Sequence, residues 1–281
     1  MNDIAKANKG FLPCEPSHDN ALKLCEITSK FYSENSESFS QTRNAPWHGW
    51  GKVIKATKLS GTTDNTIKVF DLGCGNLRFE NFLVNSLTDY NFNFHAVDNC
   101  ESLAREHLNS LRKKPNVSIE YQNIDVMRAL SANVLLDALN AQRQSFNLAV
   151  AFGFMHHIPR FHWRLELLRT LAAYTEIGSC FAVSFWQFLN SEKLAKKAHV
   201  TTKRAKEVLG LGELGNNNFL LGWQNSEDTF RFAHHFTERE LCLLKAKLAD
   251  TARAVCEFSS DGKQGNLNRY IVFEVFKKSF L

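Results

Sequence analysis

The chain has 281 residues, of which 44% are hydrophobic and 22% are charged. These fractions are those of ordinary globular domains, and they exclude a mostly disordered chain, a collagen and a coiled coil. The formal net charge of +5 permits a nucleic-acid partner without requiring one. The seven cysteines are odd in number and lack C-x-x-C spacing, so we expect reduced thiols in a cytoplasmic protein, with neither disulfides nor a metal site.

Residues 1–65 are predicted to form an N-terminal arm and a helical cap. Residues 1–20 are polar and lack the apolar centre of a signal peptide. Residues 20–40 have the apolar spacing of a helix, Pro46 ends that pattern, and residues 51–60 fit a second short helix. No stretch of the sequence approaches the roughly 18 apolar residues of a membrane-spanning helix, so we expect no membrane partner.

Residues 66–281 are predicted to form one domain in which strands alternate with helices. Runs of β-branched and aromatic residues that end in turn formers indicate strands, and apolar residues at helical spacing indicate helices. Such alternation predicts βαβ units with a parallel sheet. In chain order, we expect strands at 67–70, 92–97, 117–124, 146–154 and 180–186, with helices at 77–89, 100–114, 126–140 and 161–175.

After the fifth strand, residues 190–229 are predicted to be an insertion on the substrate side of the domain. The insertion starts with a lysine-rich helix over 190–209 and continues as a loop over 210–218. Thr237 and Glu240 have the spacing of a capping box at the start of a later helix. The chain is expected to close with a strand over 230–236, that helix, and a hairpin of residues 251–258 and 269–277.

The most informative motif runs from Val69 to Leu77, where a strand passes through a glycine turn into a helix. Gly73 and Gly75 let the backbone approach a ligand closely, and the start of the helix offers unpaired N–H groups. A dinucleotide-binding turn would have a third glycine where this chain has Arg78, which argues against NAD and for a ligand without a pyrophosphate. An ordinary turn between a strand and a helix is the alternative.

Acidic residues end the first three predicted strands. They are Asp71, Asp98 and Asp125, in chain order. In open α/β folds, the carboxylate after the second strand accepts hydrogen bonds from ribose hydroxyls, which we expect for Asp98. Asp125 lies where an adenine amino group would be recognised. Together the three acids favour a nucleoside ligand over solvated strand ends.

These residues resemble those of the class I S-adenosylmethionine-dependent methyltransferases, over roughly residues 67–188. The resemblance implies a Rossmann-like, seven-stranded, mostly parallel sheet with helices on both faces, and S-adenosylmethionine as the cofactor. It also implies that the glycine turn passes the methionine part, that the second acid holds the ribose and that the third approaches adenine. The cofactor-binding residues are then Asp71, Gly73, Cys74, Gly75, Asp98, Asn99, Asp125 and Phe152.

The fourth predicted strand leads into His156 and His157. In an open α/β sheet, the ligand crevice lies at the carboxyl ends of the strands. We therefore place this histidine pair near the transferred methyl group. For one of the two, a role in packing or capping is the alternative.

Several segments resemble a narrower branch, the tRNA wobble-uridine carboxymethyl methyltransferases. This resemblance implies esterification of the carboxylate of a 5-carboxymethyl-type uridine in tRNA, and a small activating protein partner, which eukaryotic relatives use. The chain departs from the branch where Pro46 precedes Trp47, and where Phe232 and Ala233 stand in place of the two tyrosines of an Arg-Tyr-Tyr-His motif. The resembling segments are Phe31-Tyr32, Phe39 to Trp47, His156-His157, Leu220 to Trp223, Arg231 to Leu241 and Gly265 to Tyr270.

The chemistry of a carboxylate acceptor suits this narrower resemblance. A carboxylate has a pKa of about 4, so at neutral pH it is ionised and needs positioning rather than a base. Arg43 is our candidate to clamp it, because a guanidinium binds a carboxylate with two parallel hydrogen bonds. His157 would orient the substrate as a donor. With a phenol or hydroxyl acceptor, the same histidine would have to act as a base.

Two other functions stay open. One is methylation of an oxygen or nitrogen of a small molecule, with the C-terminal block as a lid. The other is a catalytically silent module that serves as a partner subunit or RNA scaffold, against which the intact Asp71, Gly73, Gly75 and Asp98 count. Lysines of residues 190–209 could contact RNA phosphates or only form a solvated helix face.

Overall fold

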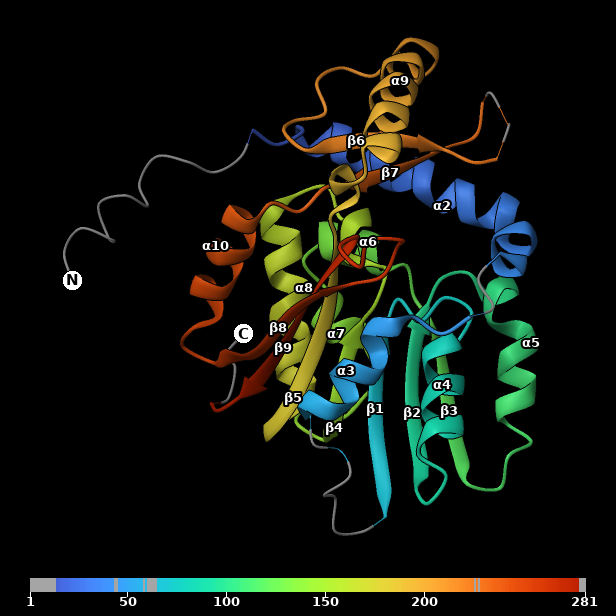
Figure 1. Ribbon diagram of the computed structural model, residues 1–281, viewed down its shortest axis with the longest axis vertical. Helices are drawn as coiled ribbons and strands as arrows, with labels where there is room; N and C mark the ends of the chain where they lie inside the picture. The colour runs from blue at the N-terminus through green and yellow to red at the C-terminus, as the bar shows by residue number, and fades with distance from the viewer. Residues whose placement is uncertain are drawn as a thin grey trace, which may run out of the picture.

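A seven-stranded sheet forms the centre of the protein (Figure 1), whose computed structural model describes residues 14–42, 45–57, 59, 65–224, 226 and 228–277. The strand order is β3-β2-β1-β4-β5-β9-β8; β9 is antiparallel to both β5 and β8, and the other neighbouring strands of this sheet are parallel. The predicted seven-stranded, mostly parallel sheet is thereby confirmed. The strands are β1 (Thr66–Leu72), β2 (Asn91–Asp98), β3 (Val117–Asn123), β4 (Phe146–Ala151), β5 (Thr175–Trp186), β8 (Ala252–Ser260) and β9 (Asn268–Val275).

Helices cover both faces of the sheet, as the sequence predicts. Successive residues of a strand point to opposite faces, so Val69 belongs to one hydrophobic cluster and Phe70 to the other. Because both faces are buried, the central strands are nearly continuous apolar runs. The helices on the Val69 face are α3 (His48–Thr57), α4 (Arg78–Ser86) and α5 (Glu101–Leu111), and those on the Phe70 face are α6 (Val126–Ser131), α7 (Leu135–Ala138), α8 (Phe161–Tyr174) and α10 (Glu238–Leu248).

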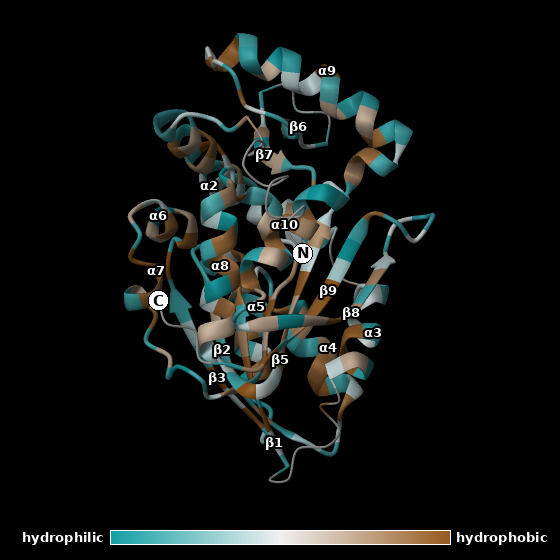
Figure 2. Cartoon of the chain, turned by 90° about the vertical axis from the view of Figure 1, so that its left-hand side faces the viewer, coloured by the Kyte–Doolittle hydropathy of each residue, from teal (hydrophilic) through white to brown (hydrophobic). Residues whose placement is uncertain are grey.

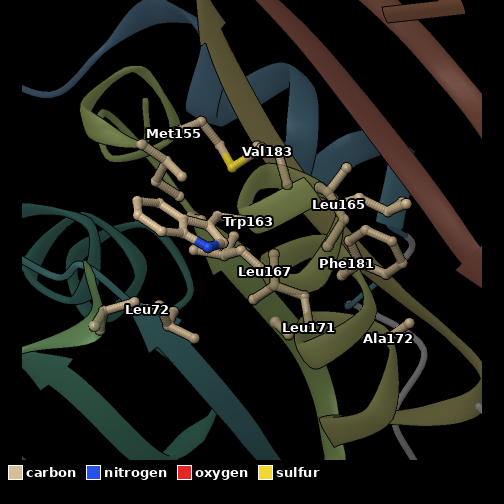
Figure 3. Packing of buried hydrophobic residues seen from close by; sticks show 14 of the residues in the cluster. Leu72, Met155, Trp163, Leu165, Leu167, Leu171, Ala172, Phe181 and Val183 are labelled. Atoms are coloured by element: carbon tan, nitrogen blue, oxygen red, sulfur yellow. The ribbon is translucent and has the colours of Figure 1, made fainter. Parts of the chain in front are cut away.

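Helix α8 packs against β5 on the Phe70 face. Trp163 and Leu167 of α8 lie in the same cluster as Phe181 and Val183 of β5, which are fully buried (Figure 3). Burying a side chain of this size contributes roughly 1.5–3 kcal/mol to folding. This packing holds the carboxyl ends of β4 and β5 in fixed positions.

A cap layer lies over the carboxyl ends of the parallel strands (Figure 1). It consists of α2 (His18–Gln41), α9 (Glu192–Leu209) and a hairpin of β6 (Asn218–Gly222) with β7 (Phe230–His234). Buried Leu24 of α2 and Phe232 of β7 share a small hydrophobic cluster, which joins the N-terminal helix to the hairpin. The predicted division into residues 1–65, 66–281 and the insertion 190–229 stays a prediction.

Helix α9 combines hydrophilic residues with some apolar ones (Figure 2), of which Val200 and Val208 are exposed. Its exposed side chains include Lys193, Lys196, Lys197 and Lys203, whereas Ala198 and Ala205 are buried against the hairpin. Among the helices of the described residues, none has the length and apolar character needed to cross a membrane.

Three elements differ from the sequence-based expectation. The helix predicted over 126–140 is divided into α6 and α7, because Asn133 between them has a left-handed backbone with φ of 55°. β5 begins at Thr175 and runs through Gly178, which is a strand residue and not a turn. β6 was not predicted, because it is only five residues long and follows a run of turn formers.

The start of α10 shows half of the predicted capping box. Thr237 Oγ1 accepts a hydrogen bond from the backbone N–H of Glu240, at 3.3 Å. The Glu240 carboxylate binds the buried side chains of Arg164, at 2.9 Å, and His234, at 2.7 Å. The carboxylate of Glu240 therefore binds side chains of other elements, whereas a capping box would place it on the backbone at the start of α10.

Candidate active site

The glycine turn after β1 has the strained backbone that its glycines permit. Gly73 has φ of +85° and Gly75 of +57°. A Cβ atom on Gly73 would lie 2.5 Å from the ring of Phe154, so no other residue fits there without movement. The N–H groups of Gly73 and Cys74 both donate to the carbonyl of Val97, at 2.8 and 3.1 Å. These bonds fix the turn against the end of β2.

Asp98 at the end of β2 is bound to this turn. Its Oδ2 accepts from the N–H of Gly75 and its Oδ1 from the N–H of Cys100, both at 2.9 Å. Burial raises the pKa of Asp98, while these backbone N–H groups oppose the rise. A carboxylate has about four lone-pair sites, so each oxygen keeps capacity for another donor.

A cavity of about 480 Å³ opens beside the turn, between the sheet and the cap layer. Strands β1, β2, β4 and β5 all contribute residues to it at or just beyond their carboxyl ends. The structure brings most of the predicted site residues together here. Those that line the cavity are Asp71, Gly73, Cys74, Gly75, Asp98, Asn99, Phe152, His156 and His157.

Among the predicted site residues that the structure describes, Asp125 does not line this cavity. Asp125 lines a smaller hollow of about 10 Å³, which shares Gly73 and Asp98 with the cavity wall. Its Oδ1 accepts from the N–H of Arg128 at 3.0 Å and caps α6, so a structural role accounts for its position at a strand end. Its approach to adenine stays a prediction. Arg43 lies outside the described residues.

Asp71 and Glu80 form a pair of carboxyl groups beneath the cavity, which the sequence did not predict. Asp71 is 3% exposed and Glu80 is fully buried in the first turns of α4. Burial raises the pKa of both groups, well above the usual range for Asp71 and to about 7 for Glu80. Two such neighbours cannot both ionise readily, so the pair holds a proton at neutral pH.

His157 is a neutral histidine with both ring nitrogens engaged. Its Nδ1 lies 3.0 Å from the carbonyl oxygen of Phe232, which can only accept, so Nδ1 carries the proton. Nε2 is then an acceptor, and the hydroxyl group of Tyr32 donates a 2.9 Å hydrogen bond to it. Burial, and secondarily the charge of Arg231, lower the pKa of His157 to about 3. The ring of His156 lies 4.0 Å from that of His157.

Arg231 of β7 is a buried cation in an aromatic cage. Its guanidinium carbon lies 5.2 Å from the ring centre of Phe31, 5.5 Å from Phe39, 6.0 Å from Trp186 and 5.7 Å from Trp223. The residue is 6% exposed and lines the cavity. Its Nε has no hydrogen-bond partner in the part of the chain that the structure describes.

A second arginine in the same cavity wall, Arg78, also contacts aromatic rings but donates hydrogen bonds to protein acceptors. Its guanidinium lies 5.5 Å from the ring of Trp47 and 5.6 Å from that of Trp50. It donates to the carbonyl of Ala45 and the side chain of Asn76, both at 3.0 Å. Protein acceptors therefore engage donors of Arg78, whereas Arg231 contacts rings and lines the cavity.

Sequence patterns could only partly reveal these residues. Tyr32 belongs to a segment that resembles a methyltransferase motif, but its contact with His157 joins residues 125 positions apart. Glu80 interrupts the apolar face of α4, and Arg231 stands between two phenylalanines in a strand whose five residues are all buried. The only sign of these residues in the sequence is a charged residue among residues that are expected to be buried. That sign does not indicate which other residue the charge contacts.

No model of a known protein family matches the sequence, and no curated protein matches it either. Solved structures do share the fold. A methyltransferase from Methanosarcina mazei, described as dependent on S-adenosylmethionine, is 17% identical, with 78% of this chain and 98% of that chain covered and a TM-score of 0.54. A protein from Listeria monocytogenes described as a possible methyltransferase of the same kind is 12% identical, with 81% and 98% covered and a TM-score of 0.51.

Human N-acetylserotonin methyltransferase, solved with S-adenosylmethionine, is a third similar structure. It is 13% identical, with 89% of this chain and 59% of that chain covered and a TM-score of 0.52. These similarities establish that the chain has the Rossmann-like fold of the class I methyltransferases.

Proposed function

We propose that this protein is an S-adenosylmethionine-dependent methyltransferase. The observation that carries the proposal is the cavity at the carboxyl ends of β1, β2 and β4, with the Asp98 carboxylate bound to the glycine turn at its wall. In open α/β sheets, ligands bind at this edge. Because the similar structures are under 20% identical, they support the fold, and the site residues must support the activity.

The residues present fit the cofactor. Asp98 has free lone pairs for two ribose hydroxyls, and Asn99 beside it lines the same wall. A Cβ added to Gly75 would meet nothing closer than Leu103 at 3.8 Å, so its absence leaves the backbone open to a ligand. Asp71, whose Oδ1 is buried without a hydrogen-bond partner, belongs to the same wall, where the ammonium group of the methionine part would favour the ionised form of its carboxyl group.

We further propose that the acceptor is a carboxylate, as on a modified wobble uridine of tRNA. When bound, the cofactor supplies an electrophilic methyl group on sulfur. A carboxylate acceptor would receive this methyl group without losing a proton, so the site would need no general base. His157 supports this acceptor, because its Nε2 lone pair is engaged by Tyr32 and its pKa of about 3 leaves it a weak base.

The tRNA part of the proposal rests on the resembling segments and on the exposed lysines of α9. Arg43 stays our candidate clamp from the sequence, and the activating protein partner also stays a proposal. A small-molecule acceptor is the second candidate, since the similar N-acetylserotonin methyltransferase is named for one.

Calorimetry separates an enzyme from a silent module. We expect S-adenosylmethionine and S-adenosylhomocysteine to bind and NAD not to bind. Failure of both cofactor forms to bind would contradict the proposal. The two acceptors are separated by the salt dependence of acceptor binding, because phosphate contacts give a steep slope and a small molecule does not.

A further inference from the structure

The caged Arg231 carries a buried positive charge. Among the described residues, no carboxylate forms an ion pair with Arg231, although the residue is only 6% exposed. We propose that Arg231 is an oxyanion site that binds the acceptor carboxylate, which makes it an alternative to Arg43 for that role. This inference rests on the proposed function and assigns a residue that the sequence did not single out for it.

The cage stabilises a charge without satisfying its hydrogen-bonding capacity. Aromatic faces attract a guanidinium through their ring electrons, but they do not offer lone pairs to its five N–H donors. A buried polar group without a partner is costly, and native structures usually satisfy it. An anion that enters the cavity and accepts these bonds removes that cost only in the complex.

The other strongly buried arginine shows what a structural role requires. Arg164 is 1% exposed, pairs with Glu240 at 2.9 Å and donates to the carbonyl of Ile158 at 2.8 Å. Glu240 thus supplies a counter-ion to Arg164 within the fold. Arg231 has a similar degree of burial without such partners, which points to a ligand as the missing acceptor.

The position of Arg231 favours the acceptor over the cofactor. Its cage includes Trp186 at the end of β5, and its charge acts on His157 just beyond β4. The proposed ribose site, Asp98, lies at the end of β2. In the order β2-β1-β4-β5, these groups occupy opposite halves of one cavity, so Arg231 is placed where a second substrate meets the methyl group.

A carboxylate matches this site in shape as well as in charge. Rings from α2, β5 and the segment after β6 lie around the guanidinium, and Arg231 also lines the cavity. A carboxylate accepts two parallel bonds from the planar fork of a guanidinium. A phosphate group would use the same chemistry, and the experiment below distinguishes the two anions.

Binding is measured by calorimetry in the presence of saturating S-adenosylhomocysteine, with 5-carboxymethyluridine, uridine and uridine 5′-monophosphate as probes. We expect the carboxymethyl nucleoside to bind at least about 10-fold more tightly than uridine, as hydrogen bonds to a charged group imply. Uridine 5′-monophosphate should bind like uridine. In Arg231→Met the advantage of the carboxylate should vanish, and Arg231→Lys should restore it only in part, because an ammonium lacks the planar fork.

The control is Arg253→Met, which removes an exposed arginine paired with Glu274 on the far edge of the sheet. It should leave the binding of all three probes unchanged. Thermal unfolding supplies a readout that a structural role would not give. If Arg231 serves a ligand, Arg231→Met should unfold at the same or a higher temperature than the wild type, since it removes an uncompensated buried charge.

Three results would overturn the assignment while leaving the proposed function intact. They are an unchanged carboxylate preference in Arg231→Met, a loss of S-adenosylhomocysteine affinity in that variant, and a tighter binding of the monophosphate that depends on Arg231. A wild type that binds S-adenosylhomocysteine but shows no preference for the carboxylate would also overturn it. A wild type that binds neither form of the cofactor would instead contradict the proposed methyltransferase function.

Discussion

The hydroxyl of Tyr32 donates a hydrogen bond to Nε2 of His157, at 2.9 Å, across 125 residues of sequence. The direction is fixed by the opposite side of the ring, where Nδ1 donates to the carbonyl of Phe232. The histidine that the sequence predicts at the methyl-transfer site is therefore held as one tautomer between the N-terminal helix and the β6–β7 hairpin. This links the two parts of the cap layer at the cavity.

The first prediction concerns the pH dependence of methyl transfer. The pKa of His157 is lowered to about 3, mainly by burial, so the ring stays neutral from pH 5.5 to 8. The single-turnover rate should not follow a titration near 6.5 in this window, and His157→Asn should retain part of the activity. A wild-type rate that rises through pH 6.5, with complete loss in the variant, would show that His157 is a base.

The second prediction concerns Asp98. In Asp98→Ala the proposed ribose hydroxyls lose a charged acceptor, and the N–H groups of Gly75 and Cys100 lose theirs. Hydrogen bonds to charged groups contribute about 1.5–3 kcal/mol, so S-adenosylmethionine affinity should fall roughly 10- to 100-fold. Calorimetry measures the affinity, and circular dichroism checks that the variant is folded. Unchanged affinity in a folded variant would exclude the ribose assignment.

The third prediction concerns the carboxyl pair of Asp71 and Glu80. The pKa of Glu80 is raised to about 7 in the folded protein from an ordinary value of 4.5. Between these values the folded state holds a proton that the unfolded state has lost, so the pair should make the protein less stable as pH rises from 4.5 to 7. The slope is about 1.4 kcal/mol per pH unit for one proton.

In Glu80→Gln the part of this loss that comes from Glu80 should disappear, because glutamine fills the site without ionising, while Asp71 keeps its own part. Urea unfolding at pH 5, 6, 7 and 8 measures the difference in the free energy of unfolding between variant and wild type. The variant should gain stability relative to the wild type as the pH increases. A difference that is constant over this range would mean that Glu80 is not protonated in the fold.

The fourth prediction concerns the buried network of Arg164, Glu240 and His234, which joins α8 and α10 to β7. Glu240→Gln leaves the Arg164 charge without its carboxylate, and breaking a buried ion pair in this way costs about 3–5 kcal/mol. The midpoint of urea unfolding should fall accordingly. Arg253→Met, at an exposed ion pair, should change stability by less than about 1 kcal/mol. Equal effects of the two substitutions would contradict this.

The parts of the fold that the sequence predicts are those fixed by local pattern. β1, the glycine turn and α4 follow from a short apolar run, two glycines and a helical spacing, and the strand-end acids follow from the alternation of elements. Local sequence patterns do not predict the ends of an element where one residue determines them. Asn133 divides a helix that is periodic on both sides, and turn formers next to Asn218 obscure β6.

The candidate site was predictable only for residues that belong to the sheet edge. Asp98 and His157 were found because every parallel strand brings its carboxyl end to that edge. The significance of Arg231 depends on rings from Phe31 to Trp223, nearly two hundred positions apart, and that of Glu80 on a carboxyl group across the turn. Such contacts are set by tertiary packing and leave no periodic trace in the sequence.

The central claim is transfer of a methyl group from S-adenosylmethionine to a carboxylate of tRNA, and the stability of the product to alkali tests it most directly. Methyl-tritiated cofactor is incubated with the protein and with tRNA from cells that lack its gene, with a lysate of those cells as a source of any activating partner. We predict label in the tRNA that mild alkali releases as volatile methanol, since methyl esters saponify. Two results would contradict the claim. One is the absence of label in the tRNA, and the other is label that resists alkali, as the methyl group of an ether or of an N-methyl base does.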